Sequence, residues 1–175
     1  MPELSLHPFP GQDSNGLTLR GAIARTNQVI TLSFLLQGKL DDLVLPATTE
    51  RTRCDNLWQA TCFEIFWAEE GKKNYWELNL APNGGWNVYA FTDYRTGMRQ
   101  EDRIAAPLIE TERTAKSFSL TAELEIGNLH ADNAPLRVGI SAVLAHRDTR
   151  LSYWAFAHPE AKPDFHAPQS FLLRL

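Results

Sequence analysis

Apolar and polar residues alternate at a period of two along most of this chain. Between positions 30 and 34 the pattern is strict, with Ile30, Leu32 and Phe34 separated by Thr31 and Ser33. Because successive side chains on a β-strand point to opposite faces, this period is typical of a strand with one buried face. No window places apolar residues at the i, i+3, i+4 and i+7 spacing of an amphipathic helix over three turns. The alternation therefore predicts an all-β chain.

About nine or ten alternating runs follow one another, many of them separated by Gly, Pro or Asn. Thr26-Asn27-Gln28 predicts a hairpin between the first two runs, and the charged segment from Glu69 to Lys73 predicts a turn between the next two. Many short strands joined by turns favour two packed antiparallel sheets, that is, an immunoglobulin-like or jelly-roll-like β-sandwich. The predicted strands cover residues 17–23, 30–36, 63–67, 76–80, 86–91, 118–124, 136–144, 151–156 and 171–175.

The length and composition of the chain indicate one globular domain. Its 175 residues lie within the usual size of a domain, and no linker, repeat or low-complexity tract divides them, so residues 1–175 are expected to fold as one unit. The hydrophobic fraction of 43% and the charged fraction of 22% match ordinary globular proteins. A formal net charge of -4 offers no positive field for phosphate groups, so nucleic acid is not an expected partner.

The sequence carries no signal for export or membrane insertion. No apolar run approaches the roughly 18 residues that span a bilayer, and the first 16 residues lack the basic and apolar regions of a signal peptide. Cys54 and Cys62 are spaced neither as a CxxC redox pair nor as a zinc motif, which is compatible with a reducing compartment. We therefore expect no membrane partner, two thiols without a chemical role and a cytoplasmic location.

The most informative stretch runs from residue 57 to residue 80. If the apolar residues at 63, 65 and 67 enter the core, the residues between them face the other way. The same alternation separates 75, 77 and 79 from the apolar residues at 76, 78 and 80. If these two strands pair as a hairpin, one non-core face carries acidic, amide and aromatic side chains together: Glu64, Phe66, Tyr75, Glu77 and Asn79.

Such a face has the composition of a sugar-binding surface. Aromatic rings pack against the C–H faces of a sugar, while carboxylates and amides bind its hydroxyl groups. Trp58, in the loop before the first of these strands, is either a lid over a site or a plug at the core edge. Arg95 is either a ligand contact or a residue that stabilises its own loop beside Asp93 and Tyr94. A solvated polar sheet face is the simpler interpretation of the same pattern.

Two strings in this stretch carry a family resemblance. They are Leu57-Trp58 followed by Cys62-Phe63-Glu64-Ile65-Phe66, and Tyr75-Trp76-Glu77-Leu78-Asn79 followed by Pro82 and Gly84. Together with Tyr94-Arg95-Thr96-Gly97-Met98 and the ending from Ser152-Tyr153-Trp154 to Pro163-Asp164-Phe165-His166, they resemble the family 9 carbohydrate-binding module and DOMON-like superfamily over nearly the whole chain, and its DOMON-like branch most closely. The resemblance implies a β-sandwich whose relatives bind either sugars or haem.

For a sugar ligand, the resemblance implies particular contacts. In the sugar-binding members a loop tryptophan and a glutamate six residues later, matched here by Trp58 and Glu64, help to hold a terminal sugar between two aromatic rings. The second ring is Trp154 or Phe165. The family commonly has a basic residue on the following strand, where this chain has an acidic one. The expected polar contacts come from Glu64, Glu77, Asn79 and Arg95.

Haem b is the alternative ligand that the resemblance implies. In the haem-binding members a methionine and usually a histidine hold the iron. Met98 is the only methionine besides the initiator, and His158 or His166 is the candidate partner. The chain has no CxxCH motif for covalent haem attachment.

The sequence does not favour an enzyme. Glu64 and Glu77 could approach the separation of about 5–5.5 Å found in retaining glycosidases, but no deep cleft is predicted beside them. The acidic and histidine side chains between positions 158 and 166 lack a spacing typical of metal ligands, and no GxSxG motif or phosphate-binding glycine loop is present. We predict a non-catalytic domain that binds a carbohydrate or a similar metabolite without a metal. A haem-binding domain and a protein-interaction module are the alternatives.

Overall fold

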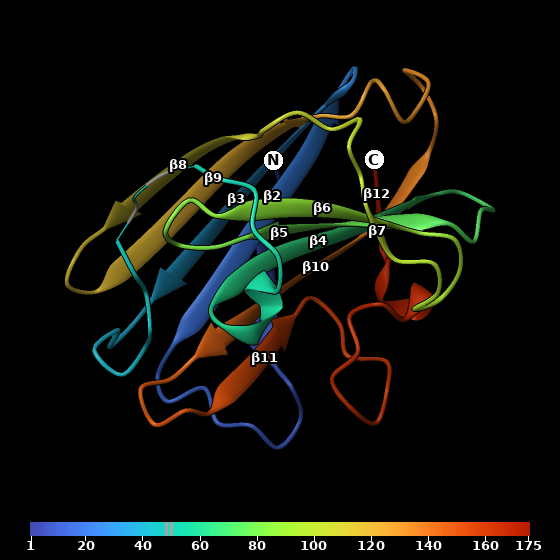
Figure 1. Cartoon of the computed structure of the whole chain (residues 1–175). Coiled ribbons are helices and arrows are strands. Elements are labelled where there is room, and N and C mark those ends of the chain that lie inside the picture. Colours follow the sequence, from blue (N-terminus) through green and yellow to red (C-terminus); the bar gives the residue numbers. More distant parts are fainter. Residues whose placement is uncertain (48, 50) are drawn as a thin grey trace.

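The computed structural model describes residues 1–47, 49 and 51–175 of the chain. Within this part every regular element is a β-strand or a single turn of 3-10 helix, which confirms the predicted all-β class (Figure 1). None of these helical turns has the length and hydropathy of a membrane span. The strands are β1 (Leu4–Pro8), β2 (Thr18–Thr26), β3 (Val29–Gln37), β4 (Cys62–Glu69), β5 (Tyr75–Leu80), β6 (Trp86–Phe91), β7 (Arg99–Gln100), β8 (Leu108–Arg113), β9 (Ser117–Glu125), β10 (Leu136–Ala145), β11 (Leu151–Ala155) and β12 (Leu173–Arg174), and the helical turns are η1 (Leu57–Gln59) and η2 (Pro168–Ser170).

The strands form one continuous antiparallel sheet rather than two separate ones. Its order is β7-β6-β5-β4-β10-β11-β1-β2-β3-β9-β8, with β12 beside β10. Strand β1 joins the two halves because it changes partner along its length: Leu4 to Leu6 pair with β2, whereas His7 and Pro8 pair with β11. The sheet therefore curls strongly, as a half-barrel whose halves face each other. This corrects the expected two-sheet sandwich.

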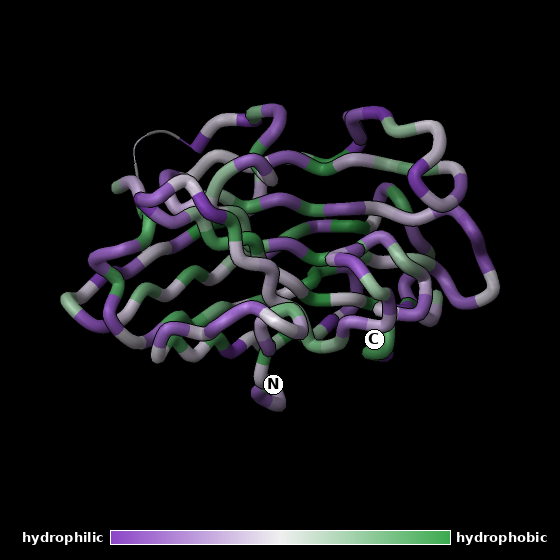
Figure 2. The backbone as a smooth tube through the Cα atoms, turned by 90° about the horizontal axis from the view of Figure 1, so that it is seen from below, coloured by the Kyte–Doolittle hydropathy of each residue, from purple (hydrophilic) through white to green (hydrophobic). Residues whose placement is uncertain are grey.

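The core lies between the two facing halves of the curled sheet. Phe63 of β4 contacts Phe34 of β3 and Phe118 of β9, with ring centroids 5.0 and 5.6 Å apart. The alternation of hydrophobic and hydrophilic residues behind this arrangement is visible along the strands in Figure 2. The residues predicted to point inward from β4 and β5 are all buried in this core, which confirms their predicted facing: Phe63, Ile65, Trp67, Trp76, Leu78 and Leu80.

A second hydrophobic cluster covers the outer face of β4, β5, β10 and β11. Phe66, Tyr75 and Val143 from these strands pack with Phe165 and Phe171 of the C-terminal segment. As a result β5 is buried on both faces, and so is β4 except for its last residue. Strand β9 instead keeps the alternating burial of a strand with one wet face. The C-terminal segment thus turns an outer sheet face into a covered one.

Some strands depart from the sequence prediction. The alternation does not predict β1, β7 or β8, which have five, two and six residues. The predicted run 171–175 forms only the two-residue strand β12, which pairs with Arg137 and Val138 of β10. The hairpin predicted around Asn27 is confirmed: β2 pairs with β3 along its full length, and Asn27 has a φ of 55° in the turn.

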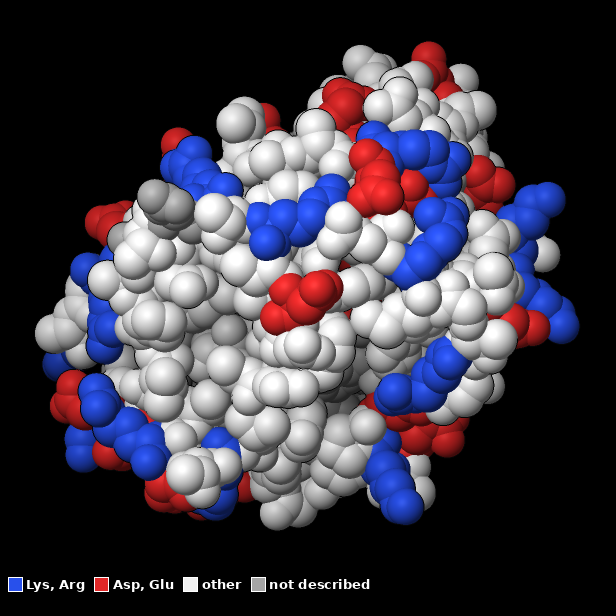
Figure 3. Space-filling model, viewed as in Figure 1, with Lys and Arg blue, Asp and Glu red and all other residues white. Residues whose placement is uncertain are grey.

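Charged side chains of both signs share the surface. On the face shown in Figure 3, Lys and Arg are interspersed with Asp and Glu, and uncharged residues cover much of the area between them. Exposed ion pairs include Arg20 with Glu3 at 3.0 Å and Arg150 with Asp148 at 2.7 Å. This mixed face differs from the continuous basic surface that nucleic-acid-binding domains present.

Candidate functional site

A cavity of about 490 Å³ opens on the outer face of β4, β5, β10 and β11, on the side opposite the core. It is bounded by η1, by loop 92–98 and by residues 163–166 of the C-terminal segment. Its volume falls within the range of about 300–1,000 Å³ that is usual for small-ligand pockets. The walls are mainly aromatic and aliphatic, formed by Trp58, Phe66, Phe91, Met98, Val143, Leu151, Tyr153, Pro163 and Phe165. The polar lining consists of Gln59, Glu64, Glu77, Arg95 and His166.

The strand register brings two acidic side chains to the base of this cavity. Glu64 of β4 pairs with Asn79 of β5 and Ser141 of β10, while Glu77 of β5 pairs with Phe66. Glu64 and Glu77 are therefore diagonal neighbours on one face, as the alternation predicts. Ser141 Oγ donates to Glu64 Oε2 at 3.3 Å, and Asn79 Nδ2 donates to Glu77 Oε1 at 2.8 Å. Asn79 orients Glu77 and does not itself line the cavity.

Both carboxyl groups are almost fully buried, which the alternation alone does not predict. Glu64 is 2% exposed and Glu77 is 4% exposed. Burial raises the pKa of Glu64 well above its ordinary value, and the charge of Glu77 raises it further. Burial also raises the pKa of Glu77 to about 7, against the opposing effects of the Asn79 hydrogen bond and the Arg95 charge. The base of the cavity therefore favours protonated acids.

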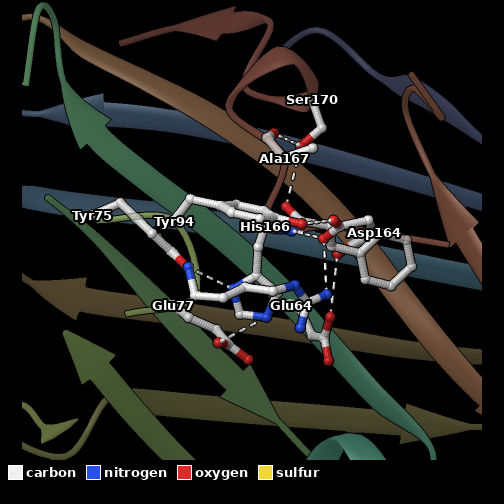
Figure 4. Close-up of polar contacts among 11 residues, drawn as sticks. Glu64, Tyr75, Glu77, Tyr94, Asp164, His166, Ala167 and Ser170 are labelled. Atoms are coloured by element: carbon white, nitrogen blue, oxygen red, sulfur yellow. Dashed lines mark hydrogen bonds and ion pairs between the residues drawn. The ribbon is translucent and has the colours of Figure 1, made fainter. Parts of the chain in front are cut away.

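His166 reaches the same cavity from the C-terminal segment (Figure 4). Its Nδ1 lies 2.8 Å from Tyr75 Oη, and its Nε2 lies 3.8 Å from Glu77 Oε2. Its ring contacts those of Phe66 and Phe91 edge-on, with centroids 5.0 and 5.2 Å away. Burial, and then the charge of Arg95, lower the pKa of His166 to about 4, so the imidazole is neutral near pH 7.

Arg95 and Asp164 tie loop 92–98 to the C-terminal segment at the cavity rim. Arg95 Nη2 lies 2.8 Å from Asp164 Oδ1, and Tyr94 Oη donates to Asp164 Oδ2. The backbone of Arg95 is left-handed, with a φ of 50°, and its N–H donates to Tyr75 Oη at 3.2 Å. Arg95 thus lines the cavity and also stabilises its own loop.

Two of the aromatic residues expected from the sequence line the cavity. Trp58 stands half-buried in η1, with its ring 5.6 Å from that of Tyr89 at an angle of 73°. Phe165 lies in the C-terminal segment and contributes to the wall and to the second hydrophobic cluster. The two rings reach the cavity from segments more than a hundred residues apart in the chain.

Trp154, the other expected stacking ring, is placed differently. Its side chain points into the core between the sheet halves, where its Nε1 donates to Ser152 Oγ at 3.1 Å. Tyr153, which pairs with Val143 on the outer face of the sheet, lines the cavity instead. The run 151–156 has apolar side chains on both faces, so its own alternation does not reveal which ring faces outward. The register of β11 with β10 determines that Tyr153 is the ring that faces outward.

Two of the side chains considered for haem, Met98 and His166, line this cavity. Met98 is 46% exposed at the cavity edge. Both ring nitrogens of His166 already face protein groups, and Nε2 of His158 lies 2.9 Å from the backbone carbonyl oxygen of His7. In the described ranges, no three His, Cys, Asp or Glu side chains gather as a metal site. The ring nitrogens of His166 thus face protein groups, whereas an axial haem ligand must turn one of them towards the iron.

The raised pKa of Glu77 predicts a pH-dependent difference in stability between the wild type and Glu77→Gln. Between about pH 4.5 and 7, folded Glu77 keeps a proton that the unfolded chain releases. Its contribution to stability is therefore complete below about pH 4.5 and is lost as the pH rises through about 7. We expect the free energy of unfolding of the wild type, relative to that of Glu77→Gln, to fall across this window.

Urea unfolding at several pH values between about 4.5 and 7.5 measures this difference. His166 has a lowered pKa and contributes the opposite slope, between about pH 4 and 6.5, but it is present in both proteins and cancels. Glu123→Gln, at an exposed position of β9, controls for the general effect of replacing a glutamate. A wild-type-to-variant difference that stays constant with pH would contradict a protonated, buried Glu77.

Comparison with known proteins establishes the fold. No protein-family model and no curated protein sequence matches the chain. Among solved structures, a candidate carbohydrate-binding protein from Bacteroides uniformis superposes with a TM-score of 0.66 at 13% identity, covering 97% of this chain and 84% of its own. A family 9 carbohydrate-binding module from Caldicellulosiruptor kristjanssonii, solved with cellotriose, superposes with a TM-score of 0.56 at 9% identity, covering 91% and 74%. The chain therefore has the fold of family 9 carbohydrate-binding modules.

Proposed function

We propose that this chain is a non-catalytic domain that binds a carbohydrate, or a metabolite of similar size and polarity, in the cavity on the outer face of β4, β5, β10 and β11. The observation that carries the proposal is the meeting of aromatic walls with two buried carboxyl groups in one cavity of about 490 Å³. The fold shared with the carbohydrate-binding modules supports it.

The two kinds of lining match the two kinds of surface on a sugar. Trp58, Tyr153 and Phe165 offer ring faces and edges to the C–H groups of the pyranose. Glu64 and Glu77 supply directional partners for hydroxyl groups at the base. A protonated carboxyl group both donates and accepts a hydrogen bond, which suits a hydroxyl group that does the same.

The electrostatics of the base support binding rather than glycoside hydrolysis. A retaining glycosidase needs one carboxylate that is ionised and acts as nucleophile, beside a second carboxyl group that is protonated. Burial raises the pKa of both Glu64 and Glu77, and for Glu77 to about 7, so the ionised nucleophile is disfavoured. The Caldicellulosiruptor kristjanssonii protein that shares this fold is a carbohydrate-binding module.

Glu64→Gln is expected to change selectivity among sugars that differ at one hydroxyl group. The amide presents a fixed donor and a fixed acceptor in place of a carboxyl group that can change its protonation. We expect the ratio of Kd values between two epimers to change by roughly fivefold or more, that is, by about 1 kcal/mol.

Calorimetric titration of both proteins against a panel of mono- and disaccharides measures this ratio. Glu123→Gln is again the matched control, because it changes the same group on the other half of the sheet. An identical rank order of sugars for the wild type and Glu64→Gln would remove Glu64 from the proposed contacts. A panel in which no sugar binds would defeat the proposed function itself.

A further inference from the structure

We propose that the preferred ligand of this cavity carries a primary ammonium group, as an amino sugar does, and that Glu64 and Glu77 receive this group at the base. The inference rests on the proposed function and specifies the chemical class of the ligand. It follows from the two buried acidic groups at the base of the cavity, which have no cation paired with them among the described residues.

Glu64 lies among neutral hydrogen-bonding groups. Its side chain is almost fully buried and lines the cavity. It accepts a hydrogen bond from the neutral Ser141 hydroxyl at 3.3 Å, and the thiol of Cys62 also interacts with it. In the part of the chain that the structure describes, Glu64 forms no ion pair with a lysine, arginine or histidine. A buried carboxyl group without a cation is forced towards its neutral form, and a cation placed beside it relieves that cost.

The neighbours of the Glu77 carboxyl group are also neutral near pH 7. One of its oxygens accepts a hydrogen bond from the neutral Asn79 amide, and the other lies 3.8 Å from His166 Nε2. The lowered pKa of His166, about 4, leaves that ring neutral near pH 7. The guanidinium group of Arg95 stands at the rim, where Asp164 holds it at 2.8 Å. Arg95 lowers the pKa of Glu77 from the rim, but its ion pair is with Asp164. Among the described residues, the two acidic groups at the base therefore have no cation paired with them.

The walls above the acids suit a cation as well as a sugar ring. Phe66 pairs with Glu77 across the two strands, and Phe91, Trp58 and Tyr153 line the same cavity. Aromatic faces attract an ammonium group through their quadrupoles, most strongly where water is excluded. An ammonium group has three donors and no acceptor, which matches a base made of carboxyl oxygens. A neutral hydroxyl group at the same place leaves the two acids without a countercharge.

Three matched sugars test this assignment in calorimetric titrations near pH 6.5: glucose, glucosamine and N-acetylglucosamine. At this pH glucosamine carries the ammonium group, whereas acetylation keeps the nitrogen and removes its charge. We expect glucosamine to bind at least about tenfold more tightly than either neutral sugar. We also expect its heat of binding to differ between phosphate and Bis-Tris buffers, because the carboxyl group that receives the cation releases its proton to the buffer.

Two variants and a second pair of probes distinguish a failure of the ammonium assignment from a failure of the carbohydrate proposal. Glu64→Gln should lower the ratio of glucosamine to glucose affinity, while Glu123→Gln on the distant strand β9 should leave that ratio within about twofold. Equal binding of all three sugars would overturn the ammonium assignment and leave the carbohydrate proposal standing. Binding of cyclohexylamine but not cyclohexanol, with no sugar bound, would keep the assignment and defeat the carbohydrate proposal. No binding by any of these probes would overturn both.

Discussion

Replacing Phe63 with alanine is expected to lower the free energy of unfolding by about 3–5 kcal/mol, the cost of removing a fully buried phenylalanine ring. Phe63 is the residue of β4 that contacts both Phe34 and Phe118 on the facing half of the sheet. Its loss leaves a void where the two halves meet. Urea unfolding followed by circular dichroism measures the change.

Leu108→Ala is the matched control for this prediction. Leu108 lies on β8 with 64% of its side chain exposed, so its truncation should change stability by no more than about 0.5 kcal/mol. A Phe63→Ala variant that loses less than about 1 kcal/mol would contradict the face-to-face packing of the two halves.

Replacing Trp58 with alanine is expected to weaken every ligand that binds the cavity by about 1–3 kcal/mol, or roughly 5- to 150-fold in Kd. The indole stands half-buried on η1, where it touches Tyr89 and packs against the second hydrophobic cluster, so its partly exposed ring can contribute contact area to a ligand. Calorimetric titration measures the loss of affinity, and a thermal melt shows whether the fold is retained.

Trp154→Phe is the informative comparison for the Trp58 variant. Its ring lies on the core side of β11, away from the cavity, so this change should lower stability while ligand affinity stays within about twofold. A Trp58→Ala protein with a sharply lowered melting temperature and unchanged ligand affinity would instead make Trp58 a packing residue of the second hydrophobic cluster.

Much of the fold follows from local pattern. In β3 and β9 the period of two corresponds to one buried and one wetter face, so the sequence locates these strands. The turn residues around Asn27 locate the hairpin between β2 and β3. In β4 and β5 the same pattern locates the inward residues but conceals that the outer face is buried too. The burial of that face depends on Phe165 and Phe171, which arrive from about a hundred residues further along the chain. Such a contact leaves no periodic signal.

The continuity of the sheet is a second feature that the sequence pattern does not predict. The partner change of β1 within five residues depends on the geometry of both neighbouring strands, and nothing in the run from Leu4 to Pro8 indicates it. A short strand of this kind contributes too few alternating positions for its period to be recognised.

The candidate site also combines features that the sequence predicts with features that it does not predict. Alternation sets Glu64 and Glu77 on one face, because that property depends only on their spacing along two paired strands. The assembly of His166 with Glu77, and the choice of Tyr153 over its neighbour Trp154, depend on tertiary packing and on the register of β11. The sequence could therefore indicate the chemistry of the base of the cavity, but not the full set of rings that surround it.

The central claim, that a carbohydrate binds in the cavity on the outer face of β4, β5, β10 and β11, is tested most directly by a two-dimensional NMR titration of the ¹⁵N-labelled protein with mono- and disaccharides. The indole N–H signals of the five tryptophans serve as reporters on different parts of the molecule. We predict that a binding sugar shifts the signals of Trp58 and of backbone groups near Tyr153 and His166, while the buried indole of Trp67 is unaffected. Shifts confined to β2, β3, β8 and β9, or no shift with any sugar, would contradict the claim.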